Sequence, residues 1–403
     1  MENYTREAIK GNCAVVLGGY VNGYSIALEL HEKNIENIAL VQYGKQLAGY
    51  SNLFNTKLSV DKTSGTLLLA LQKLSKEFGY LVLFPTDDLF IENLYSIREK
   101  IEDFAFLPFN PGNIISASDK AVQYQFCEKL GVPYPKSVEL KNINDVPDLA
   151  NRLRLPIIIK PNKREDLKIK VFRSVTISSE NELSTHQESL KTYFEKGVSF
   201  LASEIVPGHT NGTIYAYVGY RSPKTKTILN EWIGRKLTQY PDDYGVFSSA
   251  SNEAPEIIRA HGQALLNGMD LYGICEPEFK YDPRDGDYKL MEINLRSMMW
   301  HRVGNLSGVF LQQTQWLDAL GKTVPKYEQS TKLVHFSYLK HEVVNLVLRK
   351  GYFRLFKQNL YKGDENRLAM FTKGDLKPFI IDQGNTITTL VKQVAKKLLR
   401  RVK

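Results

Sequence analysis

Three polar side chains at alternate positions are of the types that bind metal ions and phosphate groups. Glu292, Asn294 and Arg296 lie two residues apart in YKLMEINLRSMMW (288–300), which otherwise has the pattern of a strand. Because side chains alternate between the faces of a strand, we expect these three to share one face. A carboxylate and an amide oxygen on one face suit a hard divalent cation such as magnesium.

A hairpin is predicted to bring a second carboxylate to the same place. The segment between Asp282 and Tyr288 contains an Asp-Gly pair, which is typical of a turn between two antiparallel strands. If Asp282 and Tyr288 face each other, Glu278 lies directly opposite Glu292.

The same register places Glu276 opposite Asn294. Two carboxylates directly opposite each other on a sheet repel, and a cation such as Mg²⁺, which prefers oxygen ligands, would compensate them. The alternative is a strand that faces solvent and whose glutamates pair with lysines.

Two lysines lie at the ends of predicted elements. Lys160 ends the short apolar strand pattern of 155–163, and Pro161 fixes the exit of the chain. Lys120 lies within a capped helix pattern at 116–135, which Gly and Pro residues end. As a point charge a lysine can hold a phosphate group, and an ordinary surface lysine is the alternative for both.

The first 110 residues have the alternating pattern of a small parallel sheet. Strand, glycine loop and helix follow one another in 13–34, and further strands are predicted in 37–44 and 81–88. This alternation predicts a Rossmann-like fold up to the turn-rich break at 109–113. The glycines lack the dinucleotide spacing, so we interpret them as tight-turn residues: Gly18, Gly19 and Gly23.

Two aspartates follow the last of these strands. Asp87 and Asp88 stand where such a sheet places its ligands, beyond the carboxyl end of the strand. A helix N-cap is an equally good interpretation of either residue.

Length and composition indicate a globular protein of two or three domains. The chain has 403 residues, 43% of them hydrophobic, and no apolar run approaches the roughly 20 residues of a membrane span. The start has no secretory pattern, and Cys13, Cys127 and Cys275 are far apart. Free thiols fit a reducing cytoplasm and argue against structural zinc, so we expect a cytoplasmic protein.

Positive charge is concentrated near the C-terminus. The net charge is +9, yet residues 331–403 hold 16 Lys and Arg against 5 Asp and Glu, whereas the rest of the chain holds 37 against 39. A nucleic-acid-binding protein would be basic more uniformly, so we expect no nucleic acid partner.

The last residues have the pattern of a basic amphipathic helix. In 388–403 apolar residues recur at spacings of three and four, among six Lys and Arg and no acid. Such a helix can lie in the headgroup layer of an anionic membrane, so we expect contact with the inner membrane surface. The alternatives are a stripe packed on the protein core, or a contact with polyphosphate or nucleic acid. The stripe consists of Leu390, Val391, Val394, Leu398 and Val402.

Taken in order, these pieces resemble the ATP-grasp superfamily over about residues 10–320. The likeness depends on their combination, because each motif alone is common. Within the superfamily, 233–246 and 280–296 are most similar to the carboxylate–amine ligase branch that includes bacterial D-aspartate ligases. The matching motifs are Ser118-Asp119-Lys120, Pro156 to Pro161 around Lys160, Ser203 to Gly208, Gly273 to Asp282 around Glu278, and Glu292 to Arg296.

The resemblance implies an α/β (α+β) fold in three parts. A Rossmann-like domain would cover residues 1–110. An ATP-grasp domain with two α+β subdomains that clamp ATP would cover 111–325, and a basic, mostly helical region would cover 326–403. The oligomeric state stays open.

The resemblance assigns the nucleotide site to residues of several motifs. Glu204 would accept a hydrogen bond from the adenine amino group, and Ile205 and Val206 would supply backbone hydrogen bonds. The ATP phosphates would be bound by four lysines: Lys120, Lys160, Lys170 and Lys236.

The metal and catalytic roles fall on the two strands and their neighbours. Arg296 would steady an acyl phosphate or the substrate carboxylate, Arg235 would contact phosphate or substrate, and Lys160 would act with them at the transferring phosphoryl group. Mg²⁺, as two ions or with Mn²⁺ in its place, would be held by Glu278, Glu292 and Asn294.

The activity that the resemblance implies is the ATP-dependent joining of a carboxylate to an amine through an acyl phosphate, with release of ADP and phosphate. The branch suggests an amino acid joined to a cell-wall or surface-polysaccharide precursor. His301 is a candidate base for the amine, and an ordinary packed histidine is the alternative.

One stretch departs from the family pattern. Many members close a glycine-rich loop over the phosphates after the lysine that matches Lys160, but 161–175 has no glycine. The positive charge of Lys168 or Lys170 would then do the work of that loop at the phosphates. The departure favours an alternative function, a non-catalytic ATP-binding regulatory protein, whereas the intact set of metal ligands favours an enzyme.

Overall fold

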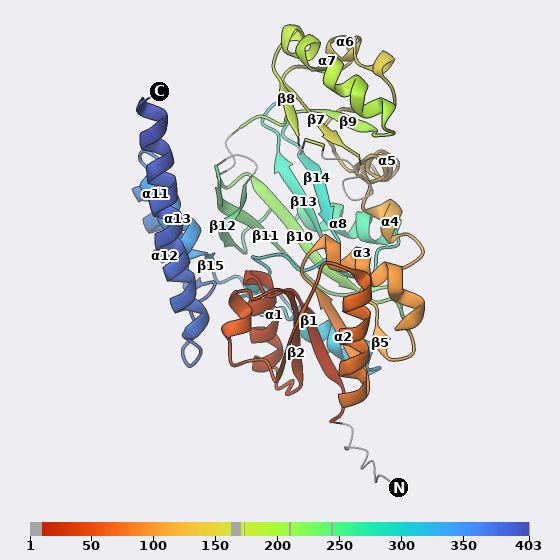
Figure 1. Cartoon of the computed structure of the whole chain (residues 1–403), viewed down its shortest axis with the longest axis vertical. Helices are drawn as coiled ribbons and strands as arrows, with labels where there is room; N and C mark the ends of the chain where they lie inside the picture. Colours follow the sequence, from red (N-terminus) through yellow and green to blue (C-terminus); the bar gives the residue numbers. More distant parts are fainter. Residues whose placement is uncertain (1–9, 163–170, 173, 209–210, 243–244, 403) are drawn as a thin grey trace.

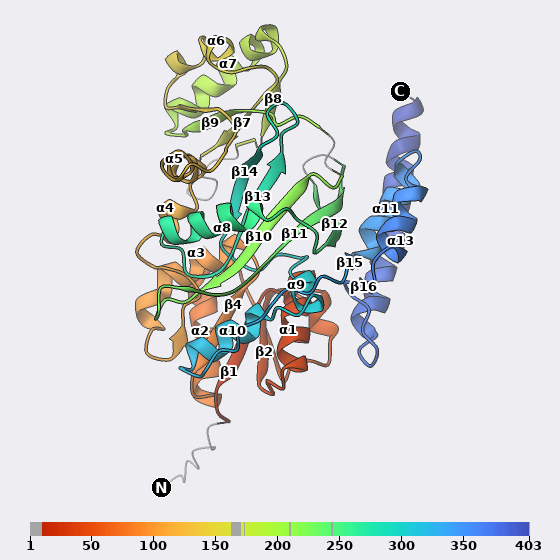
Figure 2. The same ribbon diagram turned by 180° about the vertical axis from the view of Figure 1, so that it is seen from behind.

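Three β-sheets follow one another along the long axis of the molecule, and the C-terminal helices lie along one side (Figures 1 and 2). The computed structural model describes residues 10–162, 171–172, 174–208, 211–242 and 245–402, with the backbone alone for 393–402.

The strands are β1 (Cys13–Leu17), β2 (Ile38–Tyr43), β3 (Thr56–Val60), β4 (Leu81–Pro85), β5 (Ala105–Phe106), β6 (Ser137–Leu140), β7 (Ile157–Pro161), β8 (Val175–Ile177), β9 (Phe200–Glu204), β10 (Ile214–Arg221), β11 (Ile228–Tyr240), β12 (Val246–Ser251), β13 (Gly273–Tyr281), β14 (Tyr288–Asn294), β15 (Val334–Ser337) and β16 (Glu365–Leu368).

The α-helices are α1 (Val21–Glu32), α2 (Ser64–Glu77), α3 (Asp88–Ile97), α4 (Ile114–Ala117), α5 (Lys120–Leu130), α6 (Leu149–Arg152), α7 (Glu180–Glu195), α8 (Ile257–Gly268), α9 (Arg302–Leu306), α10 (Leu311–Ala319), α11 (Leu339–Leu348), α12 (Phe353–Tyr361) and α13 (Lys377–Val402). Short 3₁₀ turns are η1 (Leu47–Tyr50), η2 (Arg98–Lys100) and η3 (Ile143–Asp145).

The N-terminal sheet is parallel and buried on both faces. Its strand order is β3-β2-β1-β4-β5. Val15 and Val16 of β1 belong to two different hydrophobic clusters, one on each face of the sheet. Continuous apolar strands are typical of such a doubly covered parallel sheet. The predicted alternation of strands and helices is confirmed over this part of the chain.

The glycine loop after β1 packs tightly. Gly18 has a φ of +114°, and a Cβ there would lie 1.9 Å from Thr86 Oγ1. A Cβ on Gly23 would lie 2.0 Å from the carbonyl oxygen of Gly18. These glycines therefore allow a tight turn and a close contact between loop and helix, as the sequence suggested.

A second, antiparallel sheet forms the far end of the molecule, in the order β6-β9-β7-β8 (Figure 1). It has a hydrophobic core of its own, in which Ile157, Ile159 and Phe200 are fully buried. Lys160 follows these isoleucines on β7 and is half-buried at the end of the strand.

The central sheet has the order β14-β13-β10-β11-β12-β15-β16 and is antiparallel except at its last pair. Its strand β15 pairs with β12, so residues beyond 325 extend the sheet of the predicted ATP-grasp domain. The C-terminal region is thus not helical throughout, and the large sheet crosses the predicted boundary.

A buried carboxylate joins the C-terminal region to the central sheet. Glu342 of α11 is fully buried. Its side chain accepts hydrogen bonds from five side chains, three of which come from β11 and β12: Thr238, Ser248, Ser249, Tyr352 and Asn359. Because a buried charge without partners is strongly unfavourable, these donors fix α11 and α12 on the sheet.

The helix predicted for the last residues is present. It begins earlier than predicted, at Lys377, and its backbone continues to Val402. Among the described residues, no helix is both long and apolar enough to cross a membrane.

A buried glutamate also joins the N-terminal sheet to the helices that follow the hairpin. Glu29 of α1 is fully buried, accepts a hydrogen bond from the Gln313 amide at 2.9 Å and contacts the Asn305 side-chain amide. Burial raises the pKa of Glu29 to about 7, against the opposing effect of these hydrogen bonds.

We therefore predict that Glu29 contributes stability to the folded protein that is lost as pH rises from about 4.5 to about 7. The folded state holds the Glu29 proton more tightly than the unfolded state, so this contribution, about 3 kcal/mol in total, is complete below the unfolded pKa and lost above the folded one. Denaturant unfolding across this pH range measures it. The free energy of unfolding of Glu29→Gln should lack this falling contribution, so its difference from wild type should change by about 3 kcal/mol over the range, while Glu36→Gln, at an exposed position nearby, should show the wild-type profile. The same slope in wild type and Glu29→Gln would contradict the assignment.

Candidate active site

The hairpin of β13 and β14 brings the predicted carboxylates together. Glu278 pairs with Glu292, and Glu276 with Asn294, as the sequence register predicted. The premise of that register was wrong by one residue, because Tyr281 rather than Asp282 faces Tyr288. A β-bulge corrects the offset, since it inserts one additional residue between Glu292 and the turn.

The additional residue of the bulge is Met291, and its backbone has a function in the site. Its carbonyl oxygen accepts a hydrogen bond from Lys120 Nζ at 3.3 Å. The same ammonium group donates to Glu292 Oε2 at 3.0 Å. Lys120 is the first residue of α5, which Asp119 caps by accepting from the Ala121 amide. The cap and the bulge together place this lysine beside the carboxylate.

A second lysine compensates the other glutamate. Lys236 of β11 is 6% exposed, and its ammonium group contacts Glu278, which is 7% exposed. The charge of Glu278 is thus paired within the interior, as a buried charge must be. The alternative of glutamates paired with lysines is what the structure shows, although one pair is buried rather than facing solvent.

The two carboxylates differ in their pKa. Burial raises the pKa of Glu278 to about 6, against the effect of Lys236. Lys120 lowers the pKa of Glu292 well below its usual range, and Lys236 and Lys160 add to this effect. Lys160 therefore lies close enough to the hairpin to act on it electrostatically, although it comes from a different sheet.

The residues present fit a magnesium ion. Glu278, Glu292 and Asn294 offer two carboxylates and an amide oxygen, which are ligands that a hard cation prefers. Asn294 Nδ2 donates to Glu276 Oε1 at 3.2 Å, which orients the amide and leaves its oxygen for a ligand. No group of three or more His, Cys, Asp or Glu side chains suited to a metal occurs in the described part of the chain. A cation here would thus complete its shell with phosphate oxygens or water.

Glu276 and His301 form a buried pair that the sequence did not predict. His301 Nε2 lies 2.5 Å from Glu276 Oε2, and the Met298 amide donates to His301 Nδ1 at 3.2 Å. Because Nδ1 accepts, the proton lies on Nε2 and is donated to the carboxylate. Both ring nitrogens are engaged, so these contacts fit the packed-histidine alternative and not a base for the amine. The sequence signal that could have assigned Glu276 to the site is its spacing of two residues from Glu278, which puts both side chains on the same face of β13.

Arg296 links the hairpin to the N-terminal sheet. Its guanidinium donates to both oxygens of Asp88, at 2.6 and 3.0 Å. Asp88 opens α3, and Asp87 caps that helix by accepting from the Phe90 amide at 2.9 Å. The sequence placed the two aspartates at the ligand edge of the sheet, but the partner of Asp88 follows only from the fold.

Arg235 lies next to Lys236 on β11 and points to the other side of that strand. Its Nη2 donates to Glu253 Oε2 at 2.7 Å, and the side chain is 29% exposed. Its Nε is buried and has no hydrogen-bond partner in the described structure. Arg235 therefore lies on the face of β11 opposite the candidate site, and its predicted contact with phosphate or substrate stays a prediction.

The predicted adenine-binding residues are partly engaged with the protein. Glu204 Oε1 accepts from the Arg154 amide at 3.0 Å, and Arg284 lies 3.4 Å from Oε2. The Ile205 amide donates to the Pro156 carbonyl, and the Val206 carbonyl accepts from the side chain of a lysine on β13. Among the described contacts, the Ile205 carbonyl and the Val206 amide therefore remain for an adenine edge. Lys168 and Lys170 lie outside the described residues.

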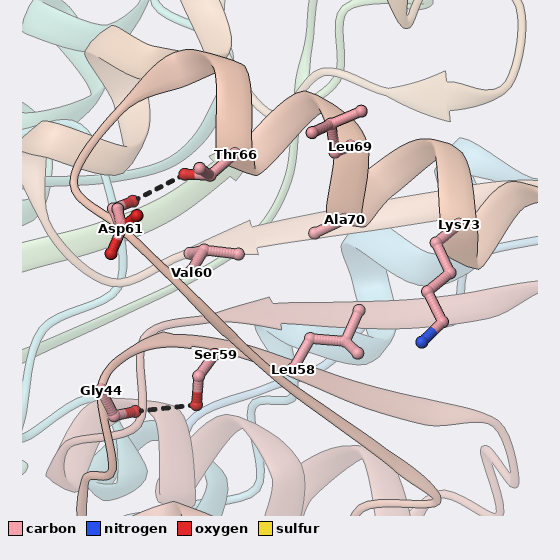
Figure 3. A pocket seen from close by; sticks show the side chains of 9 residues that line it. All are labelled: Gly44, Leu58, Ser59, Val60, Asp61, Thr66, Leu69, Ala70 and Lys73. Carbon is pink, nitrogen blue, oxygen red and sulfur yellow. Dashed lines mark hydrogen bonds between the residues drawn. The ribbon is translucent and has the colours of Figure 1, made fainter.

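A hollow elsewhere on the surface contains none of the predicted site residues. It has a volume of about 410 Å³ and lies between β3 and α2, at the edge of the N-terminal sheet (Figure 3). Two hydrogen bonds cross its rim, from Thr66 Oγ1 to the Asp61 carbonyl and from Ser59 Oγ to the Gly44 carbonyl. Leu69 and Lys73 line its other side.

Comparisons with known proteins identify the fold. No family model matches the chain. It is 24% identical over 306 residues, 70% of each chain, to the D-aspartate ligase of Enterococcus faecium (strain Aus0004). It is similar in structure to the N5-carboxyaminoimidazole synthetase of Staphylococcus aureus complexed with ADP, with a TM-score of 0.62, 15% identity and coverage of 88% of this chain and 89% of that one. A similar match is the L-amino acid ligase of Bacillus licheniformis, with a TM-score of 0.58, 12% identity and coverage of 80% and 79%. The chain thus has the ATP-grasp fold, and its predicted resemblance to the carboxylate–amine ligases, a branch of ATP-dependent enzymes, is confirmed.

Proposed function

We propose that the protein is an ATP-dependent ligase that joins a carboxylate to an amine through an acyl phosphate. The observation that carries the proposal is the grouping at the hairpin of two opposed glutamates, one asparagine and lysines from separate elements. Metal ligands and phosphate-binding cations are thus available at one place. The ligase and synthetase relatives support this class of reaction.

In the first step, an oxygen of the substrate carboxylate attacks the γ-phosphorus of ATP, and ADP leaves. Glu278, Glu292 and Asn294 would hold Mg²⁺, which would supply positive charge against the transferring phosphoryl group. Lys120, Lys160 and Lys236 stabilise the phosphate charges, and the chain contributes mainly by position and by fixed charge.

In the second step, the amine nitrogen attacks the acyl carbon of the acyl phosphate. An amide bond forms, phosphate leaves, and the nitrogen loses a proton. Arg296, held by Asp88, steadies the acyl phosphate or the substrate carboxylate as a planar two-pronged donor.

The lysine contacts in the structure suggest how the site changes when it is loaded. Lys120 and Lys236 compensate Glu292 and Glu278 in the described structure. A divalent cation held by these carboxylates would take over this compensation, and the two ammonium groups would then be available to the ATP phosphates. The like charges of the hairpin are balanced in both states.

The substrate class that we propose is an amino acid, joined to a cell-wall or surface-polysaccharide precursor. Its support is the similarity to a D-aspartate ligase. We place the protein in the cytoplasm, in contact with the anionic inner membrane surface through 388–403, where a precursor of the cell envelope would be met. The basic amphipathic sequence of this segment supports the contact.

A non-catalytic ATP-binding regulator is the alternative function, favoured by the absence of glycine in 161–175. Incubation with ATP, Mg²⁺ and a panel of amino acids, read as phosphate release and as product mass, separates the two functions. Release that depends on both a carboxylate and an amine supports the ligase. ATP binding without release under every combination would support the regulator.

We predict that Glu292→Gln lowers amide formation by at least about a hundredfold, because the opposed pair loses one cation ligand. The fold should persist with a small loss of stability, because the variant loses the ion pair that Glu292 forms with Lys120 in the wild-type protein. Phosphate release against Mg²⁺ concentration and thermal unfolding are the measurements. Glu180→Gln on α7 is the matched control and should behave as wild type. Normal turnover of Glu292→Gln with normal Mg²⁺ dependence would contradict the proposed metal site.

We also predict that Lys160→Ala raises the ATP concentration needed for half-maximal rate and slows phosphoryl transfer, by about tenfold or more, because positive charge at the phosphates is lost. The dependence on the amino acid should change little. Single-turnover kinetics measure both effects, and Lys191→Ala, an exposed lysine of α7, serves as the control. If ATP affinity and rate both match wild type, Lys160 is an ordinary lysine at a strand end.

A further inference from the structure

Helix α13 buries two polar residues and exposes three large aliphatic ones, although Phe379 and Ile381 pack partly on the core. Asp382 and Thr386 are buried, whereas Ile380, Ile387 and Val391 are 62%, 64% and 64% exposed. A surface helix ordinarily shows the reverse arrangement, with its apolar stripe against the core. A stripe of exposed large aliphatic side chains is therefore a feature that needs a partner.

The orientation of α13 is fixed by hydrogen bonds on its buried side. Asp382 accepts from Tyr338 Oη at 2.8 Å, and Tyr338 Oη lies 3.2 Å from Tyr20 Oη in the loop before α1. Just before the helix, Asp375 accepts from Ser51 Oγ at 2.5 Å. If the helix turned its apolar stripe inward, these buried groups would lose their hydrogen-bond partners or become exposed. The hydrogen bonds therefore keep the stripe facing outward.

Helix α12 has the same inverted polarity. Asn359 is 3% exposed and donates to the buried Glu342. Phe353 and Tyr361 are 63% and 74% exposed, and they share one helical face with Lys357, whose Nζ lies 5.8 Å from the centre of the Phe353 ring. Aromatic and basic side chains that alternate on an exposed face are typical of a membrane interface.

The charge on this side of the molecule is positive. Three of the five acids in 331–403, namely Glu342, Asp375 and Asp382, are buried. Exposed basic residues accompany the apolar ones on α12, on α13 and in the segment between them: Arg354, Lys357, Lys373, Lys377 and Lys392. The surface therefore combines apolar anchors with positive charge and little negative charge.

We propose that the outward faces of α12 and α13 form a docking surface for an anionic lipid membrane. Anionic headgroups complement the basic residues, and the acyl boundary accepts the aliphatic and aromatic side chains. A second copy of the chain is a poor partner, because an isologous contact would place the same positive surface on both sides.

The proposal extends the contact of 388–403 from the tail to a surface that begins at Phe353. It rests on the proposed membrane contact of 388–403 and not on the proposed ligase chemistry. The buried contact from Asp382 through Tyr338 to Tyr20 connects this surface to the glycine loop at the carboxyl end of β1. Docking therefore holds the ligand edge of the N-terminal sheet in a set orientation to the membrane.

The test is co-sedimentation of the full chain with phosphatidylcholine vesicles, with and without phosphatidylglycerol. Wild type should bind only the anionic vesicles and should be released by salt, because charge and apolar burial act together. The triple variant Ile380→Gln, Ile387→Gln, Val391→Gln should bind at least about tenfold more weakly at low salt.

Leu69→Gln is the matched control. Leu69 is a 67% exposed residue of α2, and this helix lies away from α13 in both views (Figures 1 and 2), so its replacement should leave vesicle binding unchanged. The triple variant should unfold at the wild-type temperature, because the replaced side chains are exposed.

Equal vesicle binding by wild type and the triple variant, or no binding by either, would overturn the docking surface. A wild-type dimer that the triple variant abolishes would assign the surface to a second copy instead. Phosphate release with a soluble amine and without vesicles reports on the ligase alone. Loss of vesicle binding with normal release therefore counts only against docking, and absent release with normal binding counts only against the ligase.

Discussion

Two glutamates held opposite each other on neighbouring strands require positive charge beside them, and the candidate active site is arranged around that requirement. Glu278 obtains this charge from Lys236 on β11, which lies two strands away in the same sheet. Glu292 obtains it from Lys120 at the start of α5. Because each lysine belongs to a different element, the charges balance only when the hairpin, the central sheet and α5 are all in place. In the function that we propose, a metal ion would replace these lysines beside the carboxylates.

Buried acids also decide how the peripheral parts are attached. Glu342 gathers donors from β11, β12 and α12, and Asp382 is held by Tyr338. A buried carboxylate needs its hydrogen-bond donors, so these polar contacts set the rotation of α12 and α13. Several of their large apolar residues, such as Ile380, Ile387 and Phe353, are exposed as a consequence. The attachment of the C-terminal region and its exposed surface thus have one physical origin.

The N-terminal sheet is joined to the site by contacts of the same type. Arg296 reaches Asp88 at the carboxyl edge of the parallel sheet, and Glu29 contacts Asn305 on the helix that follows the hairpin. Open parallel sheets bind their ligands at this edge. A carboxylate or amine held there would be adjacent to the arginine that follows β14, which is the arrangement that a two-substrate ligation needs.

The sequence by itself determined what depends on spacing within one element or across one turn. The hairpin, the parallel sheet, the tight-turn glycines and the terminal helix follow from such local patterns, whereas the predicted pairing of Glu278 with Glu292 is correct only because a bulge offsets a one-residue error in the predicted register. The tertiary structure alone decided which lysine compensates which glutamate, the bulge at Met291, the partner of Arg296 and the outward stripe of α13. These depend on groups up to several hundred residues apart, brought together by packing and by the need of buried charges for partners, and a local pattern contains no information about either.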